Sequence, residues 1–206
     1  MKKLSCSCLI LSVSLAAAAD GPTGYGPLKL GIAKEAVEAL QAADGVFLSS
    51  PMKPYVYRAG TPKPGEDKFD AMVMTPIAPT ALESTLTFKG GVLTGFSFTF
   101  ADEGQFARAK SQLVEKFGAG TVDDKMKEEQ CIYKGGANFK KKSGSHTTIW
   151  SQQSGSDVID TKLWQFTIDH CPGNLRYATP AAHIWMLMIN TKDQEAEKAR
   201  RSKNLF

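Results

Sequence analysis

The feature that most constrains the fold is a pair of apolar runs, Leu82–Phe88 and Val92–Phe100, separated by Lys89-Gly90-Gly91. Within the runs, apolar side chains recur mainly at every second position, which is the period of a strand that buries one of its two faces. Two such runs joined by a glycine-containing turn indicate a β-hairpin. The sequence therefore predicts an antiparallel pair of strands near the middle of the chain.

Two registers are open to this hairpin. A two-residue turn at Gly90-Gly91 would pair Phe88 with Leu93 and send the apolar sets of the two strands to opposite faces. A three-residue loop that begins at Lys89 would pair Phe88 with Val92 and place both sets on one face. Because a shared face can be buried as a unit, we predict the three-residue loop. The two sets are Leu82, Leu86 and Phe88, and Val92, Phe96, Phe98 and Phe100.

Two helices are predicted from apolar side chains that recur at helical spacing. The first covers residues 33–43 and ends at Gly45. The second follows a capping-box-like start at Asp102 and Gln105 and stops at Gly118. The predicted buried stripes are Ala33, Ala36, Val37 and Leu40 in the first helix, and Phe106, Ala109, Leu113, Val114 and Phe117 in the second.

Further strand-like segments surround these helices: FDAMVMTPI before the hairpin, then QCIYKG, GSHTTIWSQQ, LWQFTIDH and HIWMLMIN after the second helix. Strands that are grouped in runs and joined by turns predict an α+β fold, with a mainly antiparallel sheet and both helices packed on one face. We expect a single domain over residues 20–192, with two possible tandem helix-then-sheet halves at 28–100 and 101–192. We expect residues 193–206 to form a charged C-terminal helix or tail.

The first nineteen residues have the pattern of a secretory signal peptide. Lys2 and Lys3 precede an apolar run, and Ala17–Ala19 supplies the small residues at which signal peptidase cuts. The run is shorter than the about 20 residues that a membrane-spanning helix needs, so we predict cleavage after Ala19 and no membrane span. The alternative is a buried N-terminal helix. The prediction places the mature chain in the periplasm or outside the cell.

Cleavage would change both the charge and the cysteine count. The formal charge of +4 falls to +2 when Lys2 and Lys3 are removed, a balance that does not favour a nucleic-acid partner. Only Cys131 and Cys171 remain, and an even pair in an oxidising compartment predicts one disulfide. Two free thiols, or a metal site that includes His170, are the alternatives; we predict no metal and no cofactor.

The stretch LKLGIAKEAVEAL resembles the opening of small envelope proteins related to the SmpA/OmlA-type outer-membrane assembly lipoprotein and to the β-lactamase-inhibitor-protein-like fold. The Leu30-Gly31-Ile32 opening and the helix after it match, whereas Ala33 stands where the family has a capping Ser or Thr. The twofold helix-then-sheet order also resembles the tandem inhibitor proteins. The resemblance implies a non-catalytic protein that uses its sheet or loops to bind another protein, and it assigns no functional residue.

No catalytic or phosphate-binding motif is found in the sequence, so we predict no catalytic residue and no enzymatic activity. Three scattered histidines, His146, His170 and His183, could serve an unrecognised hydrolase if folding brought them together. Ser143 lies close to His146 in sequence, but a nucleophile also needs a base that is aimed at it and oriented by a third group.

Two segments have the composition of contact surfaces. The segment KPYVYR carries Tyr55, Tyr57 and Arg58, and tyrosine and arginine are frequent in protein-binding hot spots; the two tyrosines could equally be buried. Lys140, Lys141 and Lys142 are predicted at a hairpin tip, where they could meet an acidic partner or anionic head groups, or simply be solvated.

The leading functional hypothesis is an exported, non-enzymatic protein-binding module: an inhibitor, an immunity protein or an envelope-assembly accessory protein. The first alternative is a binder of a small ligand or lipid in a groove between sheet and helices, lined by aromatic side chains. The candidates are Phe96, Phe98, Phe100, Trp164 and Phe166. The second alternative is the unrecognised hydrolase.

Overall fold

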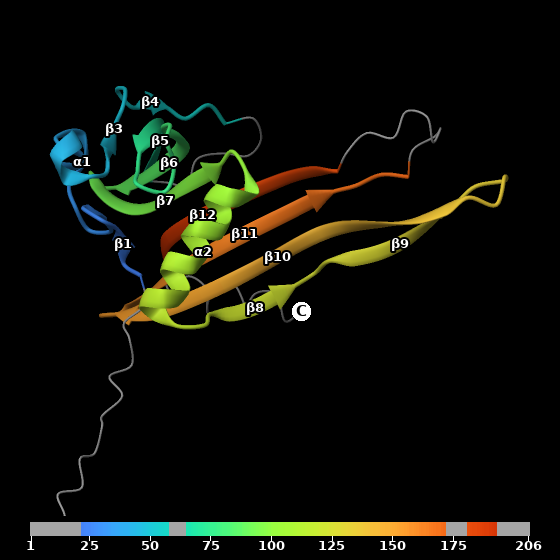
Figure 1. Ribbon diagram of the computed structural model, residues 1–206. Helices are drawn as coiled ribbons and strands as arrows, with labels where there is room; N and C mark the ends of the chain where they lie inside the picture. The colour runs from blue at the N-terminus through green and yellow to red at the C-terminus, as the bar shows by residue number, and fades with distance from the viewer. Residues whose placement is uncertain (1–21, 58–64, 172–180, 193–206) are drawn as a thin grey trace, which may run out of the picture.

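A computed structural model describes residues 22–57, 65–171 and 181–192. A large antiparallel sheet dominates this part of the chain, with the strand order β3-β5-β6-β7-β12-β11-β10-β8; in addition, β4 pairs with β5 and β9 pairs with β10 (Figure 1). The strands are β3 (Phe47–Leu48), β4 (Lys53–Pro54), β5 (Glu66–Met74), β6 (Leu82–Lys89), β7 (Val92–Phe100), β8 (Thr121–Asp124), β9 (Lys127–Ile132), β10 (Asn138–Ser154), β11 (Asp157–Ile168) and β12 (Ala182–Lys192). A separate small hairpin consists of β1 (Gly24–Tyr25) and β2 (Leu28–Lys29). The predicted α+β class is confirmed.

The pairing of β7 with β12 joins the two possible halves of the chain, 28–100 and 101–192, in one continuous sheet. Among the described residues, no helix is long and apolar enough to span a membrane. The predicted signal peptide at 1–19, the tail at 193–206 and Arg58 lie outside the described residues.

The first helix is shorter than predicted. α1 covers only Lys34–Glu38, and Val37 is its one buried side chain, whereas Ala36 is exposed. The methyl side chain of Ala33 at the N-cap cannot accept a hydrogen bond from the first backbone N–H groups of the helix. A 3-10 turn at Ala42–Asp44 follows and ends at Gly45, whose φ of 76° is in the left-handed region that suits glycine.

The second helix, α2 (Glu103–Phe117), begins as predicted. The Asp102 carboxylate accepts a hydrogen bond from the Gln105 backbone N–H at 2.9 Å, and the Gln105 side-chain oxygen accepts from the Ala101 N–H at 3.1 Å. Its predicted stripe is buried at Phe106, Ala109 and Leu113 but is wrong at Val114, which is 41% exposed. Adjacent helix positions are separated by about 100°, so the turn that buries Leu113 directs Val114 away from the sheet.

The predicted register of the central hairpin is wrong. Phe88 pairs with Leu93 and Lys89 with Val92, so the turn has two residues, Gly90-Gly91, both with positive φ. A bulge then shifts the register, because Thr87 pairs with Gly95 rather than with Thr94. The extra residue reverses the alternation, so the phenylalanines of β7 face the same side as Leu82, Leu86 and Phe88, and Val92 is left 38% exposed. A bulge, and not the predicted three-residue loop, therefore gives the two strands a shared buried face.

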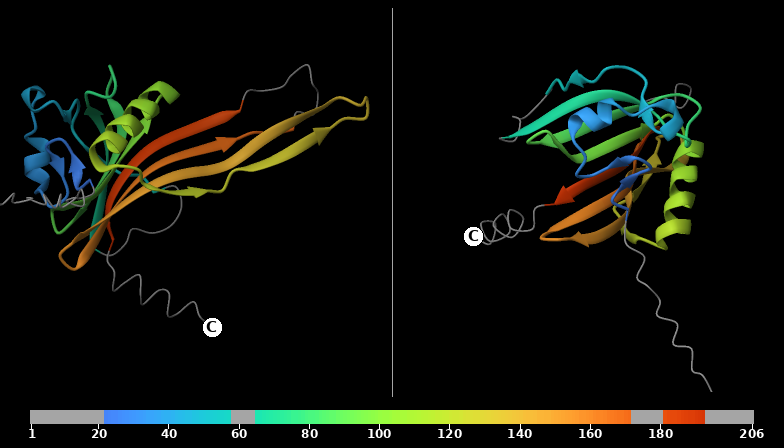
Figure 2. Two further views of the ribbon diagram at one scale, coloured as in Figure 1. Left: turned by 60° about the horizontal axis from the view of Figure 1, so that its bottom comes forward. Right: turned by 90° about the vertical axis from the view of Figure 1, so that its left-hand side faces the viewer.

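The sheet has a helix-covered face and an open face. On the helix-covered face, Phe98 of β7 lies opposite Leu187 of β12, which lies opposite Leu163 of β11; all three are buried. α2 crosses this face (Figures 1 and 2). The rings of Phe106 of α2 and Phe100 of β7 meet edge to face, with their centroids 6.3 Å apart. The β1–β2 hairpin packs on the same face, because Tyr25 meets the edge of Phe98. No described helix covers the open face.

An arm made of β9 and the adjoining ends of β10–β12 extends beyond the helices (Figures 1 and 2). β8 and β9 both pair with β10, and the register is the same on both sides of the break at Lys125-Met126 that separates them. Opposite the interruption, Gly144 has φ +133°, and a Cβ there would collide with the Lys125 carbonyl. Glycine is therefore required where the arm leaves the body of the sheet. The predicted disulfide between Cys131 and Cys171 is confirmed, with a Cα–Cα distance of 5.6 Å.

Candidate functional site

A cluster of apolar side chains lies on the open face, where β11 and β12 run side by side. Trp164 pairs with Met186 and Phe166 pairs with Ile184, and the Trp164 and Phe166 rings stack at a centroid distance of 5.5 Å. Ile168 and Ile184 are 37% and 38% exposed, and the other members are partly exposed. We name this cluster the sheet patch; it consists of Trp164, Phe166, Ile168, Ile184, Met186 and Met188.

A shallow hollow of about 380 Å³ adjoins the sheet patch at Met186 and continues across the open face toward β5. Its lining mixes polar and apolar groups and includes the side chains of Thr85, Ser97 and Thr99, with Lys53 and Asp70 at the far side. The open face therefore passes from an apolar region on β11 and β12 to a hydroxyl-rich region on β6 and β7. This arrangement of an apolar centre beside a polar rim is typical of protein-binding surfaces.

The two tyrosines predicted as contact residues reach the edge of the open face. Lys53 pairs with Asp70, and the Tyr55 N–H donates to the Lys68 carbonyl at 2.9 Å, so Tyr55 and Tyr57 alternate onto the side of Asp70 and the hollow. Their rings meet edge to face at 5.0 Å. Desolvation, with the Glu66 carboxylate as the next cause, raises the pKa of the Tyr57 hydroxyl.

The three lysines do not lie at a hairpin tip, because the tip is at Tyr133–Ala137 and β10 already begins at Asn138. The Lys140 ammonium forms an ion pair with the Glu128 carboxylate at 2.6 Å, and the Lys141 ammonium forms one with the Glu129 carboxylate at 2.8 Å, both between β10 and β9. These cross-strand pairs lower the pKa of Glu128 and Glu129, chiefly through the lysine hydrogen bonds.

The charges of Lys140 and Lys141 are thus balanced within the arm. By alternation along β10, Lys141 faces the open side, whereas Lys140 and Lys142 face the other side. The structure therefore places Tyr55, Tyr57 and Lys141 on one face but at opposite ends of the sheet. A role of the lysines in partner binding stays a prediction.

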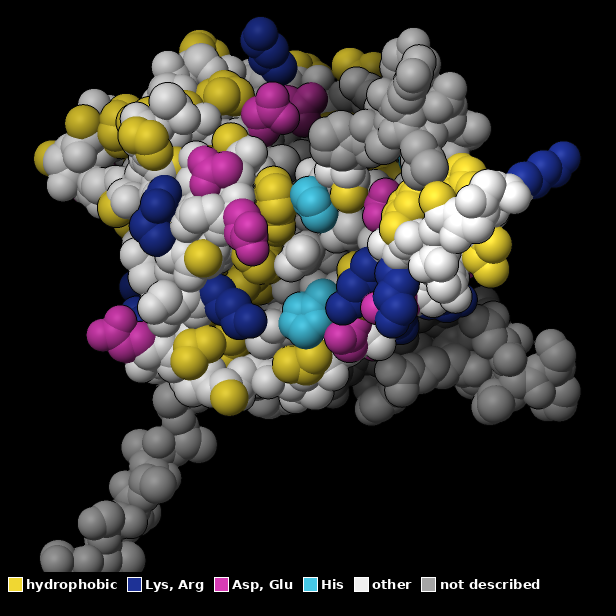
Figure 3. Space-filling view, turned by 45° about the vertical axis from the view of Figure 1, so that its right-hand side comes forward, with side chains coloured by type: hydrophobic (Ala, Val, Ile, Leu, Met, Phe, Trp, Pro, Cys, Tyr) yellow, Lys and Arg dark blue, Asp and Glu magenta, His cyan; other side chains and the backbone are white. Residues whose placement is uncertain are grey.

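The three histidines are not gathered into one cluster. His146 of β10 has its Nδ1 3.5 Å from the Asp124 carboxylate. His183 lies on β12, with β11 between the two histidines, and its Nδ1 is 3.1 Å from the Thr167 hydroxyl. Figure 3 shows two histidine side chains on one face with other side chains between them. His170 is exposed at the end of the arm. Over the described ranges, no three His, Cys, Asp or Glu side chains are grouped so that they could hold a metal ion.

The Ser143 hydroxyl is also engaged elsewhere. It donates to the Asp169 carbonyl at 3.0 Å and accepts from the Asp169 N–H at 2.9 Å. Its proximity to His146 in sequence therefore does not produce a hydroxyl–imidazole pair. The hydroxyl instead ties the end of β11 to β10, next to the disulfide.

The five aromatic residues predicted to line one groove are divided between the two faces. Phe96, Phe98 and Phe100 are buried in the core under α2, whereas Trp164 and Phe166 belong to the sheet patch on the open face. The sequence did contain a signal for the sheet patch, because the segment HIWMLMIN has apolar residues at both its odd and its even positions and so on both faces of a strand. This pattern predicts an interior strand, and β12 does lie between two other strands, but one of its two faces is open.

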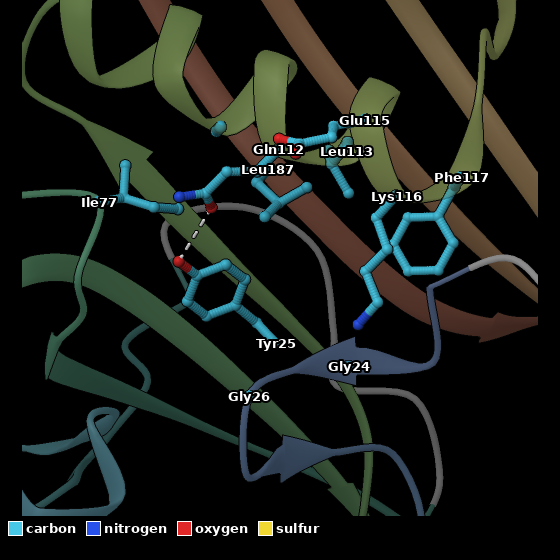
Figure 4. Close-up of a pocket in the computed structure, with 11 residues that line it drawn as sticks. Gly24, Tyr25, Gly26, Ile77, Gln112, Leu113, Glu115, Lys116, Phe117 and Leu187 are labelled. Carbon is cyan, nitrogen blue, oxygen red and sulfur yellow. Dashed lines mark hydrogen bonds between the residues drawn. The ribbon is translucent and has the colours of Figure 1, made fainter.

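A cleft of about 550 Å³ does lie between sheet and helix, at a place that the sequence did not indicate. β1 and α2 form its two sides, with Ile77 and Leu187 at the floor (Figure 4). We name it the α2 cleft. The Tyr25 hydroxyl donates to the Gln112 side-chain oxygen across it at 3.3 Å.

No family model matches this chain, and no curated protein or solved structure matches it either. The resemblance of the segment LKLGIAKEAVEAL to SmpA/OmlA-type and β-lactamase-inhibitor-like proteins therefore stays a prediction.

Proposed function

We propose that this chain is an exported, non-enzymatic protein that binds a partner protein through the open face of its sheet. The observation that carries the proposal is the sheet patch, in which six apolar side chains lie together on a face without a described helix over it. Soluble proteins rarely expose contiguous apolar surface of this kind unless it contacts another molecule.

The composition of the sheet patch favours a protein as the partner. Aromatic and methionine side chains are enriched at protein interfaces, and tryptophan is among the residues that contribute most to binding energy. The stacked rings of Trp164 and Phe166 present a rigid apolar surface, and the side chains of Thr85, Ser97 and Thr99 supply a polar border. Such a surface suits an inhibitor, an immunity protein or an envelope-assembly accessory protein.

Export is part of the proposal. The leader-like first nineteen residues support it, and the disulfide is a bond that persists in oxidising compartments. Mass spectrometry of the native protein under non-reducing conditions should find a chain that begins at Asp20 and lacks two thiol protons. A native chain that begins at Met1 with both thiols reduced would contradict the export hypothesis.

Binding is tested with variants of the sheet patch. The partner is first captured on the exported protein from envelope extract, identified, and then titrated as a purified protein. Because hot-spot tryptophans contribute about 2 kcal/mol or more, Trp164→Ala should weaken binding by about thirtyfold or more. Ile132→Ser is the matched control, since Ile132 is 77% exposed, is also apolar and lies outside the sheet patch.

Two results would overturn this assignment. The captured protein could bind Trp164→Ala as tightly as it binds the wild type, which would place the interface elsewhere. Alternatively, the wild type could form a stable dimer that Trp164→Ala dissociates, which would assign the sheet patch to self-association. Circular dichroism and the Tm of each variant establish that the fold is retained.

A further inference from the structure

We propose that the α2 cleft binds a linear aliphatic carboxylate. The cleft lies on the helix-covered face, so this site is separate from the sheet patch and the inference does not depend on the proposed protein partner. The argument rests on the apolar floor of the cleft, on one ammonium group at its side, and on a hydrogen-bonding pair that spans it.

The walls of the α2 cleft suit an alkyl chain. Leu187 of β12 and Ile77 of the β5–β6 loop form the floor, and Ala109 and Leu113 line the helix side one turn apart; these four are at most 7% exposed, and the partly exposed rings of Tyr25 and Phe117 extend the apolar lining. The volume of about 550 Å³ is within the range of small-molecule sites, which are mostly apolar with a few polar groups. The alkyl chain of a ligand would therefore lie mainly against the Tyr25 and Phe117 rings, with the edges of the buried core side chains beneath it.

The floor is held in place by a contact that does not involve the ligand. The Arg108 side chain donates through Nε to the Ile77 carbonyl at 2.9 Å, which fixes the β5–β6 loop against α2. At the C-terminal end of the helix, Trp150 Nε1 donates to the Gly118 carbonyl at 2.9 Å. The floor and the α2 side of the cleft are therefore positioned by hydrogen bonds to the rest of the fold, and a preformed site loses less entropy on binding.

Lys116 supplies the positive charge. Its side chain lines the cleft, and Figure 4 shows its ammonium directed toward Gly24 on β1. Within the described part of the chain Lys116 has no ion-pair partner; its ammonium lies 5.3 Å from the centre of the Phe117 ring. A carboxylate could accept a charge-assisted hydrogen bond from it.

The Tyr25–Gln112 pair supplies neutral hydrogen-bonding groups. Because Tyr25 donates to the Gln112 oxygen, the amide N–H₂ of Gln112 can donate to a ligand. Burial raises the pKa of Tyr25 to about 12, so the phenol brings no negative charge to the cleft at neutral pH. Glu115 is an acidic lining residue, and in Figure 4 it lies by the helix, away from Tyr25 and Lys116.

The test is calorimetric titration of the purified exported protein with straight-chain carboxylates of increasing length, and with the alcohol of equal length as the uncharged probe. Each added methylene should strengthen binding about fourfold until the cleft is filled. The carboxylate should bind at least tenfold more tightly than the alcohol. Equal affinity of the two probes, or no heat with any chain length, would overturn the proposal.

Variants identify the site. Lys116→Met keeps the apolar part of the side chain and should reduce the affinity of the carboxylate to that of the alcohol, whereas Lys110→Met, on the exposed side of the same helix, should change neither. Gln112→Trp should block both probes by filling the cleft, because Gln112 lines it and is exposed. If Gln112→Trp does not fold, the Lys116→Met and Lys110→Met comparison decides; unchanged carboxylate binding in Lys116→Met would refute the assignment.

Discussion

Loss of the disulfide should destabilise the protein mainly through the entropy of its unfolded chain. Cys131 and Cys171 are 40 positions apart, and the bond joins β9 to the segment that follows β11. In the loop-closure relation, a loop of this length corresponds to about 13 cal/mol/K, or about 4 kcal/mol at room temperature. We therefore expect Cys131→Ala/Cys171→Ala to lower the free energy of unfolding by up to about 4 kcal/mol.

The location of the bond determines how this loss should be distributed. The arm extends beyond the helices, and Cys131, which is 2% exposed, is one of its few fully buried side chains. Without the cross-link, the β9–β10 ladder should open independently of the core, because little apolar surface holds it closed. Amide exchange should then accelerate in β9 and remain slow in β7, where the phenylalanines are buried.

The assay is urea unfolding of the oxidised wild type, the reduced wild type and the double alanine variant. Reduction keeps both side chains, so its comparison with the alanine variant separates the cross-link from the packing of Cys131. The reduced and variant proteins should also have a larger denaturant dependence, because their unfolded chains are more expanded. If the oxidised and reduced proteins differ by less than about 1 kcal/mol, the loop-entropy reasoning is wrong.

Three further predictions each concern one residue: a glycine, a helix cap and a tyrosine with a raised pKa. Gly144→Ala should cost about 2 kcal/mol or more in urea unfolding, because of its φ and the Lys125 carbonyl; Gly135→Ala, with open space around it, should be nearly neutral, and equal losses would refute the argument. Asp102→Ala should cost about 1 kcal/mol through loss of the N-cap, and Asp102→Asn should retain most of it; an equal loss in both would assign the effect to charge instead. Tyr25, with its pKa raised to about 12 from 10.0, favours the folded state fully below pH 10 and loses this contribution as the pH rises toward 12, since the unfolded chain deprotonates first. Tyr25→Phe should therefore show a shallower decline in Tm over this range than the wild type, and parallel declines would count against the assignment.

Much of the local structure follows from short-range patterns in the sequence. The capping pair at Asp102 and Gln105 and the stop at Gly118 specified α2, because capping involves atoms that are only a few residues apart. Apolar alternation located β6 and β7, and the paired cysteines identified the disulfide. Each of these features is a local pattern or a simple pairing of residue types.

The candidate sites depended on long-range pairing. Whether β12 would be covered on both faces could not be read from HIWMLMIN, because coverage depends on the path of α2 and not on the strand itself. The α2 cleft likewise brings Tyr25 to Gln112, which is 87 positions later in the chain. No periodicity within either segment could indicate that contact.

The sequence by itself determined the α+β class, the second helix and the cross-link, since propensity, capping and cysteine count act over short distances or through residue type alone. The tertiary structure decided the hairpin register, through a bulge at Thr94, opposite Thr87 and Phe88, that buries the phenylalanines of β7. It also decided which apolar side chains remain at the surface. The physical reason is that one added residue in a strand reverses every side chain after it, and only packing against the rest of the fold selects between the two outcomes.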